Sequence, residues 1–123
     1  MKLLLTGCTG FIGRELIPLL MKEGHSLTVI SRQSKVKLKS IANDPSINFI
    51  EMNPAESWSW KKKEIQTSLK RCEGVINLAG EPIAEKRWTE DHCKEITNSR
   101  IDTTKNLIEN LRNLKKPPKV LIN

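Results

Sequence analysis

Residues 3–13 read LLLTGCTGFIG, a short apolar run followed by three glycines, Gly7, Gly10 and Gly13. The leucines do not alternate with polar residues, which is typical of a strand buried on both faces of a sheet. After the glycines, apolar residues recur at helical spacing over residues 11–23, and a further glycine marks the end of that helix. A buried strand, a glycine turn and an amphipathic helix in this order predict the first unit of a parallel α/β sheet.

The three glycines are suited to holding a phosphate group. Gly7 lets the chain turn sharply out of the strand, and Gly13 lets the helix pack closely against the sheet. Gly10 lacks a Cβ, so a pyrophosphate can approach the backbone N–H groups at the helix N-terminus, where the helix dipole favours anions. An ordinary strand-to-helix turn has little need of three glycines. We therefore predict a cofactor-binding turn that comprises Gly7, Thr9, Gly10, Phe11, Ile12 and Gly13.

The rest of the chain alternates strands with helices. We expect strands at 26–31, 47–52, 74–80 and 119–123, helices at 33–43, 61–72 and 89–114, and a loop at 55–60. Parallel strands joined by right-handed crossovers predict an α/β fold, a Rossmann-type parallel sheet with helices on both faces and strand order 3-2-1-4-5. With 123 residues, the chain is expected to form one domain that stops at its fifth strand.

The end of the second strand predicts which dinucleotide binds. NAD sites usually place Asp or Glu there, about 20 residues beyond the glycine turn, to accept from the ribose 2′-hydroxyl. This chain instead has Ser31 and Arg32, with Lys35 nearby. An arginine can bind a 2′-phosphate bidentately, so the pattern favours NADP(H) over NAD(H). The alternative is that Arg32 is one more surface cation in a basic protein.

The fourth strand ends in NLAG, and its last residues are predicted to lie beside the cofactor. In an open parallel sheet, ligands bind beyond the carboxyl ends of the strands, next to the switch point between strands 1 and 4. Leu78, Ala79 and Gly80 are therefore expected beside the cofactor and small enough to let its ribose approach. A tight turn at Gly80 would also explain this glycine, and both roles are compatible.

Two stretches carry a family resemblance. TGCTGFIG, followed by GH and VISR, resembles the extended short-chain dehydrogenases/reductases. VINLAGEPIAEKRWTEDHCKEITNSRIDTTKNLIE is similar to one branch, NADP-dependent oxidoreductases that are called sugar-nucleotide epimerase-like or cell-division-inhibitor-like. The resemblance implies that Glu95 and Arg100 on the long helix reach the cofactor, with Arg100 directed to its phosphates or ribose. The alternative is that both side chains face solvent or neighbouring charges.

The chain lacks one residue type that this family uses in catalysis. The resemblance implies a Tyr-x-x-x-Lys pair on the helix after the fifth strand, in which the tyrosine exchanges the proton and the lysine lowers its pKa. The sequence contains no tyrosine. We therefore expect the NADP-binding portion of a longer oxidoreductase or epimerase-like protein, without its catalytic helix and substrate domain, that binds cofactor but does not turn it over alone. The alternative is a complete, non-catalytic NADP-binding or interaction module.

Composition restricts the other partners. Three cysteines and two histidines show no metal-ligand spacing, and the N-terminal apolar run is too short for a signal peptide or a membrane span, so we expect a cytoplasmic protein with free thiols. The net charge of +7 permits nucleic-acid binding, but no aromatic residues interleave with the lysine clusters, so this is the weakest hypothesis. The substrate of the full-length protein, a small molecule, is not identified by these residues.

Two expectations concern the surface. Trp58, Trp60 and Trp88 are expected to pack in the core or in a lid rather than to stack on a substrate. A sheet that stops at its fifth strand exposes a parallel edge and an apolar face, which predicts homodimer formation or poor solubility.

Overall fold

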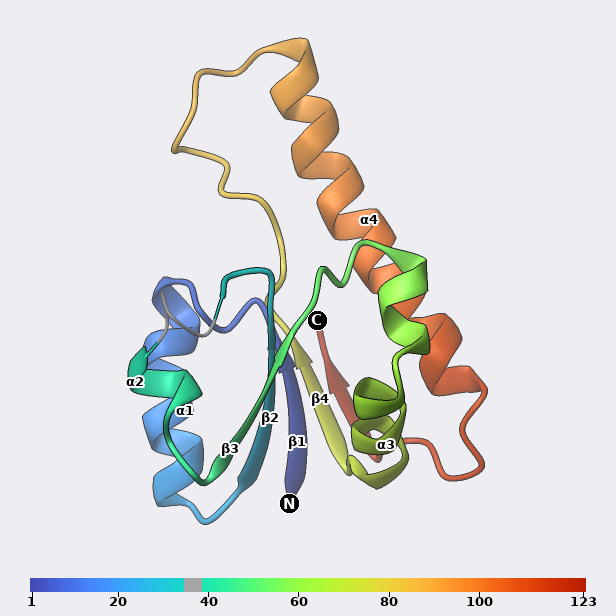
Figure 1. Ribbon diagram of the computed structural model, residues 1–123. Coiled ribbons are helices and arrows are strands. Elements are labelled where there is room, and N and C mark those ends of the chain that lie inside the picture. The colour runs from blue at the N-terminus through green and yellow to red at the C-terminus, as the bar shows by residue number, and fades with distance from the viewer. Residues whose placement is uncertain (35–38) are drawn as a thin grey trace.

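The computed structural model describes residues 1–34 and 39–123. It contains a five-stranded parallel sheet in the order β3-β2-β1-β4-β5 (Figure 1). The strands are β1 (Lys2–Thr6), β2 (Ser26–Ser31), β3 (Ile47–Glu51), β4 (Gly74–Asn77) and β5 (Val120–Ile122). The predicted Rossmann-type sheet and its strand order are therefore confirmed.

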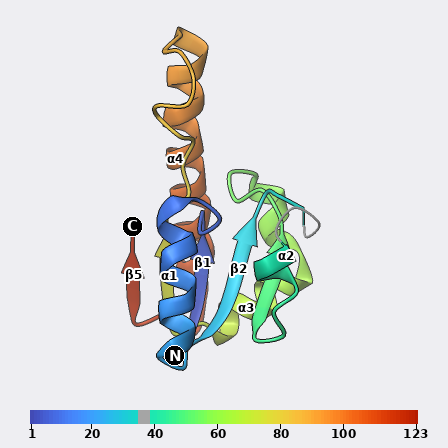
Figure 2. The same ribbon diagram turned by 90° about the vertical axis from the view of Figure 1, so that its left-hand side faces the viewer.

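Helices cover both faces of the sheet (Figures 1 and 2). Helix α1 (Phe11–Lys22) and the short α2 (Lys39–Ala42) lie on one face. The 3-10 helix η1 (Ser57–Lys61), α3 (Lys63–Arg71) and α4 (Glu90–Arg112) lie on the other. Of the helix expected over 33–43, residues 35–38 lie outside the described residues.

The leucine run of β1 supplies both halves of the core. Leu4 packs into the cluster under α3 and α4, whereas Leu3 and Leu5 pack into the cluster under α1. All three are buried, and Leu4 and Leu5 are fully inaccessible to solvent. A central strand with a helix layer on each side requires apolar side chains on both faces, which explains why this run does not alternate.

The structure corrects the expected loop at residues 55–60, which contains η1. The Ser59 hydroxyl donates to the Asn53 and Glu56 carbonyls at 2.7 Å, and the Trp60 indole N–H donates to the Pro54 carbonyl at 2.9 Å. Trp60 is fully buried in the core, so the turn forms around a tertiary anchor that local sequence signals do not reveal.

The other two tryptophans are not core residues. Trp58 is 60% exposed and lies under the Lys62 ammonium group, 5.5 Å from the ring centroid, so it does not pack in the core. Trp88 is 65% exposed, and its indole N–H donates to the Ile83 carbonyl at 2.9 Å. Both rings therefore lie at the surface, Trp58 on η1 and Trp88 on the connection between β4 and α4.

The long helix α4 extends well beyond the carboxyl ends of the strands (Figure 1). Its projecting half and the connection at residues 78–89 together form what we call the arm. Strand β4 ends at Asn77, three residues earlier than expected, because the chain leaves the sheet there to enter the arm. No helix in the described part of the chain is long and apolar enough to span a membrane.

Candidate functional site

A cleft of about 540 Å³ opens at the carboxyl ends of β1, β2 and β4. Its lining comes from the glycine turn, the end of β2, the segments after β3 and β4, and α4. Nine of the residues predicted from the sequence line it, namely Gly7, Thr9, Gly10, Phe11, Ser31, Arg32, Leu78, Ala79 and Gly80. Ile12, Gly13, Glu95 and Arg100 do not, and Lys35 lies outside the described residues.

Gly7 and Gly13 are required by the packing of the protein itself. Gly7 has a φ of +69°, and a Cβ there would lie 2.3 Å from the backbone of Leu78 and Ala79. A Cβ on Gly13 would lie 2.2 Å from the Cα of Cys8, so α1 touches the turn after β1. Cys8 is itself buried, and burial raises the pKa of its thiol to about 12.

Gly10 differs, because no close contact within residues 1–34 and 39–123 requires a glycine there. Its φ of −79° is open to any residue, and the nearest described atom to a built Cβ, the Gly7 carbonyl oxygen, is at an ordinary contact distance of 3.6 Å. Gly10 lines the cleft, so the space that a side chain would fill belongs to the cleft. This geometry lets a ligand come directly against the backbone of the turn.

The N-terminus of α1 is open to an anion. Gly10 is its N-cap, no side chain caps the helix, and its first turn contains no acidic residue. Helix α4 shows the opposite arrangement, since the Thr89 hydroxyl accepts from the His92 N–H at 3.1 Å and Glu90 and Asp91 stand in the first turn. The first N–H groups of a helix need a partner and carry a positive partial charge, so the uncapped end of α1 favours a negatively charged ligand.

At the end of β2, Ser31 and Arg32 have different roles. Ser31 is buried, and its hydroxyl accepts from the Gln33 N–H at 3.0 Å, which shapes the turn that follows. The Arg32 side chain is 57% exposed and forms an ion pair with Glu81, with 3.5 Å between Nη2 and Oε2. Arg32 therefore presents a solvent-accessible cation at the rim of the cleft.

A buried polar network supports the end of β4. Thr6 donates through its hydroxyl to the Asn77 side-chain oxygen, which also accepts from the Ala79 N–H at 3.3 Å. The Asn77 amide donates to Asn123 at 2.6 Å and to Thr104 at 3.3 Å. These bonds set the path of residues 78–80 along the cleft. Asn77 was not among the predicted residues, although an amide at the end of the apolar run VIN is the signal that could have identified it.

The two residues predicted on α4 lie in different surroundings. Arg100 reaches the end of β4, because a Cβ on Gly80 would lie 2.7 Å from the centre of its guanidinium group. Glu95 lies on the arm, where its carboxylate is 3.6 Å from the Lys86 ammonium and 3.4 Å from His92 Nδ1. The hydrogen bond with His92, and then the charge of Lys86, lower the pKa of Glu95. Glu95 thus meets neighbouring charges rather than the cleft.

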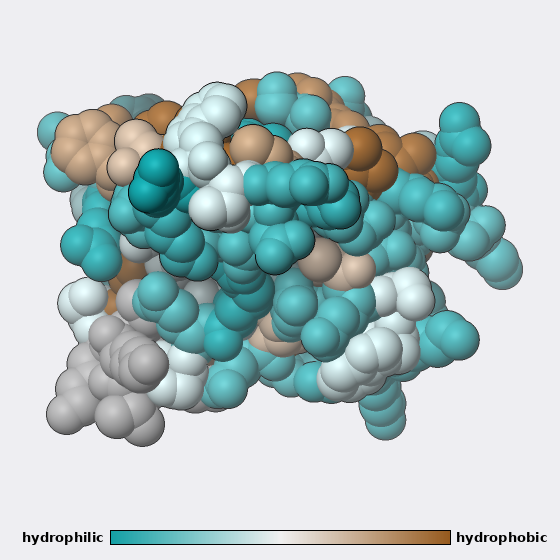
Figure 3. Space-filling model, turned by 90° about the horizontal axis from the view of Figure 1, so that it is seen from above, coloured by the Kyte–Doolittle hydropathy of each residue, from teal (hydrophilic) through white to brown (hydrophobic). Residues whose placement is uncertain are grey.

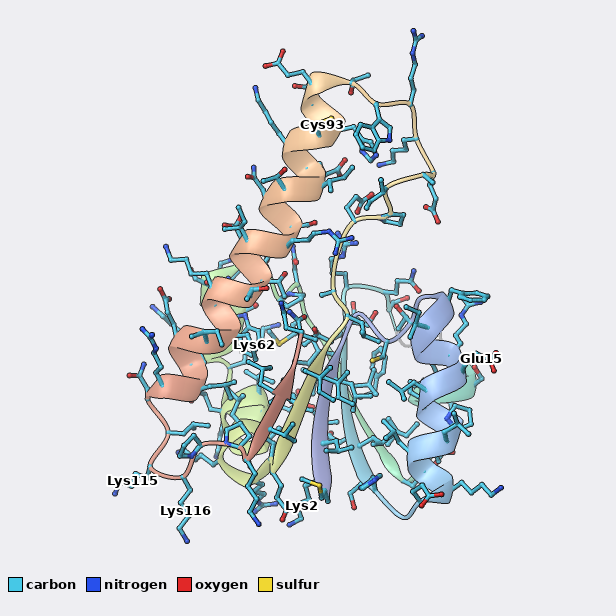
Figure 4. The ribbon with its side chains drawn as sticks, turned by 180° about the vertical axis from the view of Figure 1, so that it is seen from behind. Lys2, Glu15, Lys62, Cys93, Lys115 and Lys116 are labelled. Atoms are coloured by element: carbon cyan, nitrogen blue, oxygen red, sulfur yellow. The ribbon has the colours of Figure 1, made fainter. Side chains whose placement is uncertain are left out.

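Figures 3 and 4 show the setting of the cleft. Seen from the carboxyl ends of the strands, the surface is mainly hydrophilic, and apolar side chains gather along one margin (Figure 3). Cys93 lies on the arm beyond the sheet, while Lys2, Lys115 and Lys116 lie at the other end of the molecule (Figure 4). These three lysines are therefore remote from the cleft.

Sequence reasoning missed several polar residues that line the cleft. Arg14 donates through Nε to the Thr9 carbonyl at 3.1 Å and so braces the glycine turn. Glu81 and Ser99 meet across the cleft wall, where the Glu81 N–H donates to the Ser99 hydroxyl at 3.0 Å. The others are Gln33, Asn53, Glu85 and Thr103. Long-range packing brings these residues together, and no local spacing in the sequence predicts this.

The chain is similar to known proteins over nearly its whole length. The model of the "NAD dependent epimerase/dehydratase family" matches residues 3–123. An epimerase family protein from Staphylococcus aureus strain N315 is 35% identical over 120 residues, which are 98% of this chain and 36% of that protein. A chloroplastic SDR39U1 homolog from Arabidopsis thaliana is 37% identical over 108 residues, which are 88% of this chain and 28% of that protein.

Solved structures agree with this placement. The crystal structure of human epimerase family protein SDR39U1 with NADPH superimposes with a TM-score of 0.70 at 33% identity, over 98% of this chain and 35% of that one. Yeast methylglyoxal/isovaleraldehyde reductase Gre2, complexed with NADPH, shares the fold with a TM-score of 0.78 at 16% identity, over 98% of this chain and 36% of that one. The chain thus spans about a third of the length of these proteins. It belongs to the NAD dependent epimerase/dehydratase family.

Proposed function

We propose that this chain binds NADP(H) in the cleft at the carboxyl ends of β1, β2 and β4, as the cofactor-binding portion of an oxidoreductase or epimerase-like protein. The observation that carries the proposal is the vacant space at Gly10, next to a helix N-terminus with no side-chain cap. A dinucleotide pyrophosphate fits both features, because it is anionic and needs close backbone approach. The NADPH in the structure of human SDR39U1, 33% identical to this chain, supports the same cofactor.

Each part of the cleft is proposed to contact a different part of the cofactor. The N–H groups at the start of α1, from Phe11 and Ile12, hold the pyrophosphate. Arg32 binds the 2′-phosphate, and a guanidinium group is suited to this because it donates two parallel hydrogen bonds to phosphate oxygens. Residues 78–80 pass beside a ribose, and Arg100 lies behind Gly80 where it can add positive charge. Lys35 remains a predicted contact for the 2′-phosphate.

The chain's own residues bind and orient the cofactor in this proposal. Bound NADP(H) supplies hydride transfer at its nicotinamide ring. The family resemblance assigns the accompanying proton transfer to a tyrosine, and none occurs in these 123 residues. We therefore propose that these residues hold the cofactor and that the groups that act on a substrate belong to another part of the full-length protein.

Replacement of Arg32 tests the cofactor assignment. Arg32→Ala is expected to weaken NADPH binding by about 10- to 100-fold and to leave NADH binding nearly unchanged, since hydrogen bonds to a charged group contribute about 1.5–3 kcal/mol each. Fluorescence titration of the reduced cofactors measures both affinities. Arg112→Ala, which removes an exposed cation at the far end of α4, is the matched control and should change neither. An unchanged NADPH affinity in Arg32→Ala contradicts the assignment.

A further inference from the structure

The connection after β4 places a carboxylate inside the cleft, facing the arginine at the end of β2. The Glu81 side chain is only 12% exposed, and it lines the cleft together with Arg32. Its Oε2 lies 3.5 Å from Arg32 Nη2. The residue proposed to bind the 2′-phosphate is therefore paired with an anion in this structure.

Glu81 is the better anchored member of this pair. Its backbone N–H donates to the Ser99 hydroxyl at 3.0 Å, and that hydroxyl donates to the Ile96 carbonyl at 2.9 Å, so α4 holds the residue in place. Its second carboxylate oxygen, Oε1, lies 3.4 Å from the Lys86 ammonium group. Arg32, in contrast, is 57% exposed, and Glu81 is its only ion-pair partner among residues 1–34 and 39–123. An incoming anion would therefore displace Arg32, and Glu81 would stay.

This arrangement has opposite consequences for the two cofactors. A 2′-phosphate that binds Arg32 must compete with Glu81 for the guanidinium group and must approach a fixed negative charge. A ribose 2′-hydroxyl meets no such penalty, because a carboxylate accepts hydrogen bonds from hydroxyl groups, as the acidic residue at the end of strand 2 does in NAD sites. Here the carboxylate comes from the connection after β4 instead.

We propose that Glu81 is a specificity-determining residue that lowers the preference of the cleft for NADP(H) over NAD(H) by engaging Arg32. The inference rests on the proposed function, because it assumes that Arg32 meets the 2′-phosphate. It goes further in assigning the balance between the two cofactors to an ion pair across the cleft rather than to Arg32 alone.

The variant Glu81→Gln tests this, since it removes the charge and keeps the shape of the side chain. We expect NADPH to bind about two- to five-fold more tightly, the range that a partly exposed ion pair accounts for, with NADH binding unchanged or weaker. Glu109→Gln is the matched control, because Glu109 is an exposed carboxylate of α4 that lies outside the cleft and forms no ion pair within residues 1–34 and 39–123. It should leave the ratio of the two affinities as in the wild type.

The same Glu81 substitution in an Arg32→Ala chain tests whether the effect of Glu81 on NADPH affinity depends on Arg32. In an Arg32→Ala background, the gain from Glu81→Gln should largely disappear, as expected for two residues that act as a coupled pair. Thermal melts of every variant establish that the comparison is made between folded chains, and Glu81→Ala gives a second neutral replacement. Equal affinity ratios in wild type, Glu81→Gln and Glu81→Ala overturn the inference, and so does a gain of the same size without Arg32.

The outcomes also separate this inference from the proposed function. If Arg32→Ala keeps the wild-type preference for NADPH, the proposed function fails and the role of Glu81 fails with it. If the preference depends on Arg32 but is indifferent to the charge of Glu81, only the inference about Glu81 is overturned.

Discussion

Gly7, Gly10 and Gly13 are the same residue type at equal intervals in the sequence, but the atoms around them in the structure differ. A side chain at Gly7 or Gly13 would overlap the protein backbone at 2.2–2.3 Å, whereas a side chain at Gly10 would extend into the cleft. The stability of the fold and the binding of a ligand are thus assigned to different members of one motif. Substitutions at single glycines can separate the two contributions.

Gly10→Ala is expected to preserve the fold and to impair binding. Its backbone is in an ordinary conformation with no close described contact, so the melting temperature should fall by only about a few degrees, the cost of alanine at an N-cap. The added methyl group occupies the proposed pyrophosphate site, so NADPH affinity should fall by about tenfold or more, which corresponds to about 1.4 kcal/mol. Thermal melts and cofactor titration on the same sample measure both effects.

Gly24→Ala is the control for this substitution. Gly24 has a φ of +80° and no described atom within 4 Å of a built Cβ, so alanine there strains the backbone without touching the cleft. It should lower the free energy of unfolding by about 1 kcal/mol and leave NADPH affinity intact. If Gly10→Ala instead behaves like Gly24→Ala, losing stability but not affinity, the pyrophosphate assignment is wrong.

The residues of the cleft could be predicted from sequence only where topology alone places them. Parallel strands end at one edge of the sheet, so the glycine turn, Arg32 and residues 78–80 were expected to meet, and the structure brings them into one cleft. Glu81 and Asn77 were missed, because their roles depend on contacts with Arg32 and Asn123, which are 49 and 46 residues away in sequence. Long-range pairing leaves no periodic signal.

At the scale of elements, the N-termini of α1 and α4 differ in whether a side chain satisfies their first N–H groups. The start of α4 is closed by the Thr89 cap and two acidic residues, while the start of α1 is open. Capping stabilises a helix by satisfying its first N–H groups, so the absence of a side-chain cap on α1 leaves those groups available for a ligand. The contribution of the cap to stability can be tested with substitutions at α4.

Thr89→Ala should lower the free energy of unfolding by about 1 kcal/mol, because the His92 N–H loses its partner at the start of the arm. Urea denaturation measures the change. Thr97→Ala is matched in chemistry but lies inside α4, where the hydroxyl donates to the Cys93 carbonyl and caps nothing. It should be neutral or slightly stabilising, since alanine has the higher helix propensity. Equal losses at both positions would show that Thr89 is not acting as a cap.

The order and boundaries of the elements were largely predictable. Glycines and apolar runs mark the limits of β1, β2 and α1, which differ from the expected ranges by about one residue at most, within the usual ambiguity of helix and strand ends. The short helix η1 was missed because Trp60 and Ser59 form it through tertiary contacts. The path of the arm was missed for the same reason, because it depends on tertiary contacts such as the ion pair between Lys86 of the connection and Glu95 of α4.

At the scale of the whole molecule, the sheet is covered unevenly. Four strands are sheltered by helices, while all three side chains of β5 are exposed, at 42%, 39% and 53% for Val120, Leu121 and Ile122. An apolar edge strand offers both unpaired backbone groups and hydrophobic surface to another chain. This surface predicts that the 123-residue chain associates with itself.

Ile122→Lys is expected to weaken that association, because a charge at an edge strand opposes pairing with another strand. Sedimentation velocity over a range of protein concentrations measures it. Leu19→Lys, a substitution at an apolar residue of α1 that is 60% exposed, serves as the control and should leave association unchanged. A wild-type chain that sediments as a monomer at every concentration would contradict the prediction.

The most direct test of the account is an equilibrium titration of the wild-type chain with NADPH and with NADH under identical conditions. NADPH should bind saturably and about 10- to 100-fold more tightly than NADH, because Arg32 can form charge-assisted hydrogen bonds to the 2′-phosphate. Arg32→Ala should abolish this difference. Absence of NADPH binding, or equal affinity for both cofactors in the wild-type chain, would contradict the central claim.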